Sequence, residues 1–216
     1  MPSNGREDQG EMDMEMLSVK NLSFNYPGCQ REALDHISFT LQKGSLTVLC
    51  GKSGCGKSTL LKQIKPVLAP KGDVSGTILL EGKDINGYSA GEQSRRIGFV
   101  LQDPEQQIVT EKVWHELAFG LESLGCDQNT MRSRIAETAE FFGITDWFHK
   151  ETDSLSGGQK QILSLASVMV MRPDLLLLDE PTSLLDPVSA GNFLSTIRKC
   201  NQELGVTILI SEHRLE

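Results

Sequence analysis

The feature that most constrains this chain is the segment GKSGCGKS at positions 51–58. It matches the pattern G-x-x-x-x-G-K-[ST], in which a glycine-rich loop holds a phosphate group. A short apolar run, Leu46–Leu49, precedes the loop, and a stretch with helical spacing, Thr59–Ile64, follows it. A glycine-rich turn with an exposed lysine is the alternative interpretation, but the order strand, loop, helix favours phosphate binding.

The residue types in this loop suit a nucleoside triphosphate. Glycines permit backbone conformations that side chains disfavour, so successive N–H groups can turn inward and line an anion-sized cup at a helix N-terminus. Lys57 is then placed against the terminal phosphates, and Ser58 against a Mg2+ ion. The residues predicted to contact nucleotide here are Gly51, Lys52, Ser53, Gly54, Cys55, Gly56, Lys57, Ser58 and Thr59.

Composition limits the functional classes that remain. The chain has 216 residues, 38% of them hydrophobic, which is enough for a buried core. A net charge of -8 opposes a nucleic-acid role, because binding to a phosphate backbone normally requires a basic surface. Five cysteines without metal-binding spacing indicate reduced thiols in the cytosol. No apolar run reaches the roughly 18 residues of a membrane span, so a membrane role requires a partner.

The apolar pattern predicts strands on both sides of the phosphate loop. Between Met16 and Leu41 apolar residues often alternate, which indicates two half-buried strands joined near Pro27–Gly28. The run Leu175–Leu178 is continuous, as expected for a parallel strand that is covered on both faces. From about Glu111 to His149 the spacing becomes helical. The later predicted strands are Thr77–Leu80, Ile97–Leu101, Leu175–Leu178 and Val206–Ile210.

Two carboxylates follow the most apolar of these strands. Asp179 and Glu180 end the sequence LLLLDE and are placed at the carboxyl edge of the sheet, where α/β sites lie. We expect Asp179 to hold Mg2+, directly or through water, and Glu180 to orient or deprotonate an attacking water. Acids at a strand end are often only solvated loop residues. The phosphate loop in the same chain favours the metal role here, because Mg2+ requires oxygen ligands opposite the triphosphate.

A second glycine-containing turn, Leu155–Gln159, reads LSGGQ. With both motifs, the chain resembles the ATPase domain of ATP-binding cassette (ABC) proteins from Leu17 to Arg214. The resemblance implies an α/β fold: a P-loop NTPase (RecA-like) core with a parallel sheet, an antiparallel β subdomain near the nucleotide, and a helical subdomain, about 104–170, that carries LSGGQ. It also implies ATP and Mg2+ as cofactors. The nucleotide contacts that it implies in the second turn are Ser156, Gly157, Gly158 and Gln159. A serine that merely caps the following helix is the alternative.

Single residues elsewhere also match the family pattern. Tyr26 resembles the aromatic residue that stacks on adenine, and a tyrosine buried in the sheet is the alternative. Gln102 resembles the glutamine that senses Mg2+ and water, and His213 resembles the switch histidine that contacts the γ-phosphate. The loop Ser183–Asp186 resembles one that crosses to a partner domain. The resemblance therefore implies catalytic roles for Glu180, His213 and Gln102, and metal contacts for Ser58, Gln102 and Asp179.

The resemblance also implies partners. In this family one ATP lies between the phosphate loop of one ATPase domain and the LSGGQ of another, so the functional unit is two domains, identical, distinct or fused. The stretch Gln102–Gly125 and the final SEHRLE resemble energy-coupling-factor importers, the group that takes up vitamins and metal ions. Membership of that group implies integral membrane subunits as partners and a peripheral position on the cytoplasmic face of the cell membrane.

The ends of the sequence suggest its domain boundaries. We expect residues 1–15, which are polar and acid-rich, to form a disordered tail without chemistry, and residues 16–216 to form one ABC ATPase domain. Members of the family continue beyond the switch histidine with further strand and helix. We therefore interpret Glu216 as a boundary within a longer sequence, in which this domain could be the first of two cassettes.

Three other functions compete with ATP-driven import. A non-transport ATPase of the same superfamily, acting on ribosomes or DNA, is disfavoured by the acidic charge. A nucleotide-binding regulatory module without turnover is disfavoured because both Glu180 and His213 are present. A small-molecule kinase with a phosphate loop is disfavoured by LSGGQ.

Overall fold

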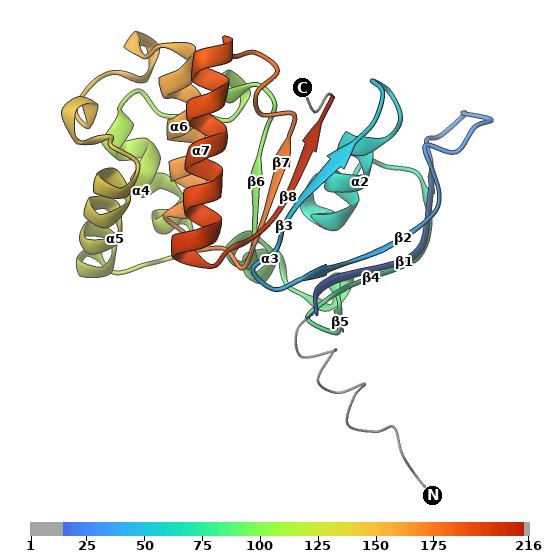
Figure 1. The fold of residues 1–216 in the computed structure, drawn as a ribbon. Coiled ribbons are helices and arrows are strands. Elements are labelled where there is room, and N and C mark those ends of the chain that lie inside the picture. Colours follow the sequence, from blue (N-terminus) through green and yellow to red (C-terminus); the bar gives the residue numbers. More distant parts are fainter. Residues whose placement is uncertain (1–14, 214–216) are drawn as a thin grey trace, which may run out of the picture.

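The computed structural model describes residues 15–213, which form two sheets surrounded by helices (Figure 1). The parallel sheet has the strand order β3-β8-β7-β6, and the antiparallel sheet has the order β2-β1-β4-β5. The parallel strands are β3 Leu46–Cys50, β6 Ile97–Val100, β7 Leu175–Asp179 and β8 Thr207–Glu212. The antiparallel strands are β1 Glu15–Asn25, β2 Leu34–Gln42, β4 Asp73–Leu80 and β5 Lys83–Asp84. The predicted α/β class, with a parallel and an antiparallel sheet, is confirmed. Apart from Glu15, which begins β1, the expected tail lies outside the described residues.

The helices cover both faces of the parallel sheet. In Figure 1, α2 lies on one side of this sheet, and α6 and α7 lie on the other. The helices are α2 Lys57–Ile64, α3 Ala90–Arg96, α4 Val113–Ser123, α5 Gln128–Phe141, α6 Gly157–Met169 and α7 Pro187–Leu204. Single 3-10 turns span Pro66–Leu68, Ile85–Gly87, Pro104–Gln106, Thr145–Trp147 and Thr152–Ser154. None of the helices within residues 15–213 combines the length and the apolar character that a membrane crossing requires.

The continuous leucine run in β7 is explained by two cores. Because side chains alternate along a strand, Leu175 and Leu177 face one side, and Leu176 and Leu178 face the other. The first pair packs in the core that contains α2 and the antiparallel sheet. The second pair packs in the core that contains α6 and α7. All four leucines are fully buried, as the absence of polar residues in this run predicts.

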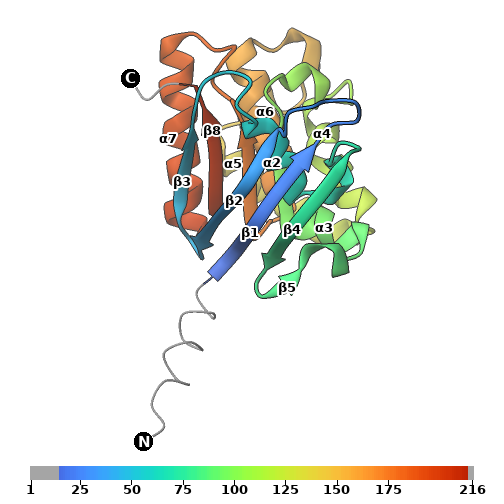
Figure 2. The same ribbon diagram turned by 90° about the vertical axis from the view of Figure 1, so that its right-hand side faces the viewer.

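The antiparallel sheet holds α2 against the parallel sheet. Figure 2 shows β2, β1 and β4 side by side in front of α2. Leu17 and Phe24 of β1 and Leu61 and Ile64 of α2 share one buried cluster, and none of these side chains is more than 1% exposed. The helix that follows the phosphate loop is therefore enclosed between two sheets. This enclosure fixes the direction in which the N-terminus of α2 points.

The remaining helices form a separate cluster beside the parallel sheet. Val113 and Leu117 of α4, Ala139 of α5, and Leu163 and Ala166 of α6 belong to one buried core. All three helices lie inside the range 104–170 that is expected for the helical subdomain. Since α6 also packs against β7 through Leu165 and Val168, this helix connects the helical cluster with the parallel sheet.

Candidate nucleotide-binding site

The phosphate loop leaves β3 and turns directly into α2. Gly56 caps the helix with a left-handed backbone (φ 97), and Gly54 is also left-handed (φ 75). A Cβ atom on Gly56 would lie only 2.5 Å from the carbonyl oxygen of Ala33, which precedes β2. The chain therefore requires glycine at position 56 for two reasons, its backbone angle and its close neighbour. The result is a loop whose amides precede a helix N-terminus, the arrangement that binds anions.

Lys57 reaches back over the loop that precedes it. Its side chain is 4% exposed, and its Nζ donates to the carbonyl oxygens of Gly51 at 2.9 Å and Lys52 at 3.3 Å. The same ammonium lies 3.2 Å from Oε1 of Glu180. A buried ammonium is stable only where acceptors surround it, and these three oxygens provide them. The Lys57 ammonium is therefore held beside the phosphate loop.

Ser58 and Asp179 meet at the carboxyl end of β7. The Ser58 hydroxyl donates to Oδ1 of Asp179 at 2.8 Å, and the Ser211 hydroxyl donates to the same oxygen at 3.0 Å. Asp179 pairs with Ser211 in the parallel register of β7 and β8, which explains why the two side chains lie together. Hydroxyl and carboxylate oxygens are the ligands that Mg2+ prefers. The donor set at Ser58 and Asp179 therefore fits this ion.

Glu180 occupies a strained and buried position between two basic groups. Its backbone is left-handed (φ 45), a conformation that costs a residue with a Cβ about 1–2 kcal/mol. The Glu180 amide donates to the carbonyl oxygen of Ser211 at 3.1 Å and to the Ser211 hydroxyl at 3.0 Å. Oε2 of Glu180 lies 2.6 Å from Nε2 of His213, while Oε1 faces Lys57. Strain of this kind persists where surrounding contacts enforce it, which is typical of functional sites.

Two other predicted residues lie at the borders of this network. The side-chain amide of Gln102 donates to the Ser183 hydroxyl at 3.1 Å. No hydrogen bond within residues 15–213 joins Gln102 to Ser58 or Asp179. The Tyr26 hydroxyl lies 2.9 Å from the Thr59 hydroxyl in the first turn of α2. Tyr26 is 36% exposed, so its ring is not the buried sheet tyrosine of the alternative interpretation.

The LSGGQ turn opens α6 on the other side of the parallel sheet from α2 (Figure 1). The Ser156 hydroxyl accepts from the Gln159 amide at 3.3 Å, and Oε1 of Gln159 accepts from the Ser156 amide at 3.0 Å. The capping alternative is therefore present in the structure. It leaves Gly157 exposed and Gly158 half-buried at the helix N-terminus, where an anion can still bind. The structure does not bring this turn onto the phosphate loop of the same chain.

Ser211 is the residue of this network to which the sequence assigned no role. It is fully buried and contacts both Asp179 and the Glu180 amide. A signal for it exists, because it directly follows the predicted apolar strand at positions 206–210, and parallel neighbouring strands end at the same sheet edge. Its partners nevertheless depend on which strand lies beside β8, and a single sequence does not specify that order.

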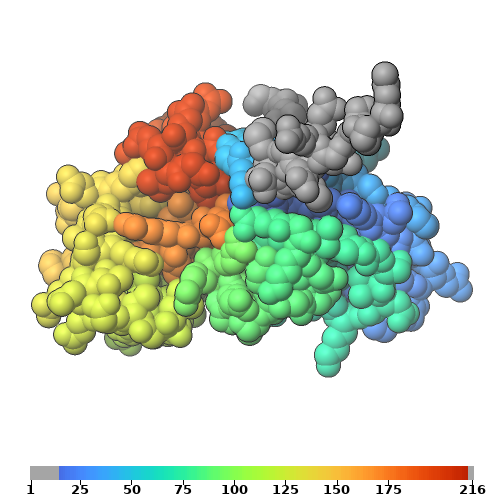
Figure 3. All heavy atoms as spheres, turned by 90° about the horizontal axis from the view of Figure 1, so that it is seen from below, coloured from blue at the N-terminus to red at the C-terminus, as the bar shows by residue number. Residues whose placement is uncertain are grey.

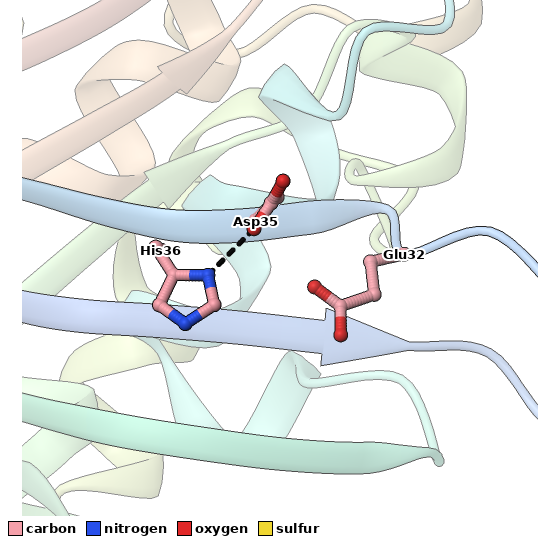
Figure 4. Close-up of side chains that lie close together, drawn as sticks. All are labelled: Glu32, Asp35 and His36. Carbon is pink, nitrogen blue, oxygen red and sulfur yellow. Dashed lines mark hydrogen bonds and ion pairs between the residues drawn. The ribbon is translucent and has the colours of Figure 1, made fainter.

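Two further features lie outside the polar network of Lys57, Ser58, Asp179, Glu180 and His213. Glu32, Asp35 and His36 are exposed, and Figure 4 shows the His36 ring directed at Asp35, with 2.6 Å between Nδ1 and Oδ1. This hydrogen bond, together with the charge of Asp35, raises the pKa of His36. A cavity of about 540 Å3 lies where the ends of α5, α6 and α7 meet, on the face shown in Figure 3. Because Pro173, Asp174 and Val206 line it, this cavity lies at the N-terminal ends of β7 and β8, at the opposite sheet edge from Glu180.

Comparison with known protein families agrees with this geometry. The family model described as ABC transporter matches residues 34–183. The chain therefore belongs to the ABC transporter family, as the two glycine-containing motifs predict, and it contains the ATP-binding domain of that family.

The most similar curated relatives include longer proteins. A Bacillus anthracis protein, provisionally named ABC transporter ATP-binding protein, is 46% identical over 198 residues, which cover 92% of this chain and 36% of the relative. A Methanosarcina mazei protein with the same provisional name is 34% identical over 215 residues, covering 100% of this chain and 65% of the relative. This chain thus spans about a third of the length of the Bacillus relatives that it matches.

Solved structures with this fold are ABC ATPase domains. The structure of cbiO1 from Clostridium perfringens, described as part of the ABC transporter complex cbiONQ, superposes with a TM-score of 0.84 at 33% identity. The superposed region covers 93% of this chain and 79% of the cbiO1 chain. The ADP conformation of MJ1267, an ATP-binding cassette of an ABC transporter, superposes with a TM-score of 0.78 at 26% identity, covering 94% of this chain and 83% of MJ1267.

Proposed function

We propose that this chain binds and hydrolyses Mg-ATP, and that hydrolysis drives the import of a vitamin or metal ion through membrane subunits of the energy-coupling-factor type. One observation carries the proposal. Lys57, Ser58, Asp179, Glu180 and His213 come from three separate chain segments and form one connected polar network at the carboxyl edge of the parallel sheet. A site that must bind a triphosphate, a divalent cation and a reacting water needs these groups together.

Each residue of the network has a distinct role in this proposal. The loop amides and Lys57 bind the phosphates, and Ser58 and Asp179 hold Mg2+, which neutralises charge on the phosphate oxygens when it is bound. Glu180 accepts a proton from the attacking water, since its carboxylate is fixed from both sides by Lys57 and His213. His213, whose side chain is 39% exposed, remains accessible to the γ-phosphate.

The position of LSGGQ supports a second ATPase domain as partner. The two anion-binding turns begin helices on different faces of one sheet, so they serve one triphosphate only when a second domain presents its turn to this phosphate loop. We infer that the partner domain is an identical, distinct or fused cassette. ATP bound between the domains joins them, and hydrolysis releases them.

The likeness to cbiO1 supports the import assignment, because that protein is part of a transporter complex. The sequence similarity between Gln102–Gly125 and energy-coupling-factor importers points to the same group. Association with membrane subunits would place the chain peripherally on the cytoplasmic face of the cell membrane. The second candidate is the ATPase of another ABC importer or exporter, which the general names of the curated relatives favour. A non-transport ABC ATPase is the remaining alternative.

The substitution Glu180→Gln tests the hydrolytic role. It keeps the shape of the side chain but replaces one acceptor oxygen by an NH2 donor and removes the side chain's ability to accept a proton. Loss of one preorganised catalytic group typically costs about 2.7–4 kcal/mol, so phosphate release should fall about 100- to 1000-fold. ATP affinity, measured with a fluorescent nucleotide, should change little.

Glu137→Gln is the matched control, because Glu137 pairs with Arg172 on the surface and lies near the opposite edge of the sheet. This control should hydrolyse ATP at the wild-type rate. Undiminished phosphate release by Glu180→Gln would contradict the assignment of Glu180. Failure of the wild-type protein to bind ATP would contradict the proposed function as a whole.

A further inference from the structure

The loop that follows Gln102 is attached to the helix that LSGGQ opens. Nζ of Lys160 lies 2.6 Å from Oε1 of Glu105, which belongs to the 3-10 turn Pro104–Gln106. Glu105 comes three residues after Gln102, and Lys160 is the first residue after Gln159. The Lys160 side chain is only 16% exposed, so most of it lies against the protein rather than in solvent.

The connection between Gln102 and Glu105 is itself ordered. The Asp103 side chain caps the 3-10 turn by accepting from the Glu105 amide at 3.0 Å, and the Gln102 amide donates to Ser183 in the loop after Glu180. A short series of contacts therefore connects the loop after Glu180 with Lys160. It passes from Ser183 to Gln102, and from Glu105 to Lys160. Its end is directly beside the LSGGQ turn.

Gln107 forms a second attachment closer to the sheet. Its Oε1 accepts from the Leu101 amide at 2.8 Å, and its Nε2 donates to the Ser164 carbonyl oxygen at 3.2 Å. This side chain joins the end of β6 to the middle of α6. The hydrogen bonds of Gln107 hold its part of the loop against the end of β6 and the middle of α6. A movement of Gln102 would therefore reach the N-terminus of α6 mainly through the part of the loop that contains Glu105.

We propose that Glu105 and Lys160 are a positioning pair, which sets the orientation of the LSGGQ turn according to the state of the nucleotide bound by the same chain. The pair touches no reacting atom, and the inference rests on the proposed function, because the turn it orients would serve the nucleotide of the partner domain. The pair thus couples one ATP site of the two-domain unit to the other.

The chemistry of the pair suits a contact that must open and close. The hydrogen bond to Glu105 raises the pKa of the Lys160 ammonium, so Lys160 stays charged through the neutral range. Glu105 is 69% exposed, and ion pairs with an exposed partner change an equilibrium by only a few-fold. Such a contact can bias the position of α6 without locking it.

Three variants test the pair: Glu105→Gln, Lys160→Gln, and the double variant that carries both changes. We expect each single variant to lower the kcat of ATP hydrolysis about twofold to fivefold while KM and the affinity for ATP stay unchanged. In the double variant the second change has no partner left to remove, so its kcat should be close to that of the single variants. Glutamine is neutral, so none of these variants adds an acid to the first turn of α6.

The control is the pair Lys112–Glu151, which has a similar N···O distance of 3.0 Å and lies in the same helical region. Lys112→Gln and Glu151→Gln should leave kcat unchanged. Wild-type kcat in both single variants of the proposed pair would overturn the inference. A double variant whose loss of rate is the product of the two single losses would also overturn it, because each residue would then act through some other contact.

A second measurement separates this inference from the proposed function. In the Glu180→Gln background, Mg-ATP should slow hydrogen exchange at the amides of residues 156–160, and the additional change Glu105→Gln should remove at least half of that slowing. Equal slowing with and without Glu105→Gln would overturn the positioning role even if the wild-type protein hydrolysed no ATP. A protein that binds ATP but never releases phosphate would contradict only the proposed hydrolysis.

Discussion

The two anion-binding turns of this chain differ in how their polar groups are satisfied. At the phosphate loop, the charged residues Lys57, Asp179 and Glu180 are 5%, 5% and 7% exposed, and their partners come from other chain segments. Lys57 pairs with Glu180, and Asp179 accepts hydrogen bonds from the Ser58 and Ser211 hydroxyls. At the LSGGQ turn, Ser156 and Gln159 satisfy each other within four residues. The first site depends on the tertiary fold, and the second needs only its own helix.

This difference agrees with the two halves of the composite site that the proposed function assigns to these turns. Buried charges require fixed partners, so the phosphate loop is preorganised around acids from β7 and a histidine after β8. A self-capped helix N-terminus keeps its shape without outside contacts, and its exposed amides can meet an anion that another domain delivers. Under the proposed function, one chain therefore contributes its phosphate loop to one composite site and its LSGGQ turn to the other.

The strongest test of the comparison is Lys57→Ala. Removal of this ammonium takes away a charge-assisted contact to phosphate and leaves Glu180 with only His213 as its basic partner. Truncating one member of a buried charged contact typically costs about 2–5 kcal/mol, so ATP affinity should fall at least about 30-fold. Titration with a fluorescent ATP analogue measures this.

Lys52→Ala is the control for that measurement, because Lys52 is an exposed residue of the same loop and only its backbone carbonyl contacts Lys57. Lys52→Ala should weaken binding much less than Lys57→Ala. Equal affinities of Lys57→Ala and wild-type protein would show that the buried ammonium does not bind phosphate, and the contrast between the two turns would lose its basis.

Gly157→Asp tests the other side of the comparison. No atom lies within 4 Å of a Cβ built on Gly157, and an acidic residue is favourable in the first turn of a helix, so the variant should fold. The added carboxylate would repel a triphosphate presented by the partner domain. ATP hydrolysis should therefore fall about 100-fold, while the affinity for ATP at the phosphate loop stays near the wild-type value.

Gly157→Ala, which adds only a methyl group in the same open space, should retain most of the activity. The contrast between the two turns is supported if Lys57→Ala loses ATP binding and Gly157→Asp loses only ATP hydrolysis. A loss of ATP affinity in Gly157→Asp as large as that in Lys57→Ala would mean that LSGGQ contributes to the first binding event in the same chain.

The sequence predicted the parts of this molecule whose signals are local. The phosphate loop, the leucine run of β7 and the two acids after it are contiguous stretches, and each has the expected secondary structure. The helix α7, Pro187–Leu204, was not predicted, because its buried side chains are only Phe193, Ile197 and Cys200 among many polar residues. Its ends carry usable signals, since Asp186 caps it, Pro187 occupies the first turn, and Gly205 ends it.

The connections within the site were harder to predict than its members. Whether Asp179 meets Ser58 and Ser211 depends on the strand order β3-β8-β7, which only the folded sheets determine. The contact of Gln102 with Ser183 likewise joins loops that are 81 positions apart. The roles of Gln102, Tyr26 and His213 were predicted from the family resemblance, because composition and spacing alone do not indicate a function for these residues.

The smallest expected effect concerns a half-buried charge at the other end of α2. Lys65, the residue after α2, donates from Nζ to the Ile97 carbonyl oxygen at 2.7 Å, and burial lowers its pKa to about 8. In contrast to Lys57, this ammonium has no proposed ligand, so its desolvation should appear only as a cost to stability. Between pH 8 and about 10.4, the unfolded chain holds the Lys65 proton more tightly than the folded chain does. Stability should therefore rise with pH across this window, because the penalty is complete below pH 8 and disappears above the unfolded pKa.

Lys65→Met lacks this titration, so the difference between the two proteins isolates it. From pH 7.5 to pH 10, the wild-type free energy of unfolding should rise by about 1–3 kcal/mol relative to that of Lys65→Met, measured by urea denaturation. Lys62→Met, the same substitution one turn earlier in α2, should show a smaller pH-dependent difference. If the difference between wild type and Lys65→Met stays constant with pH, then Lys65 is hydrated in the folded chain, and buried charge in this half of the molecule is confined to the phosphate site.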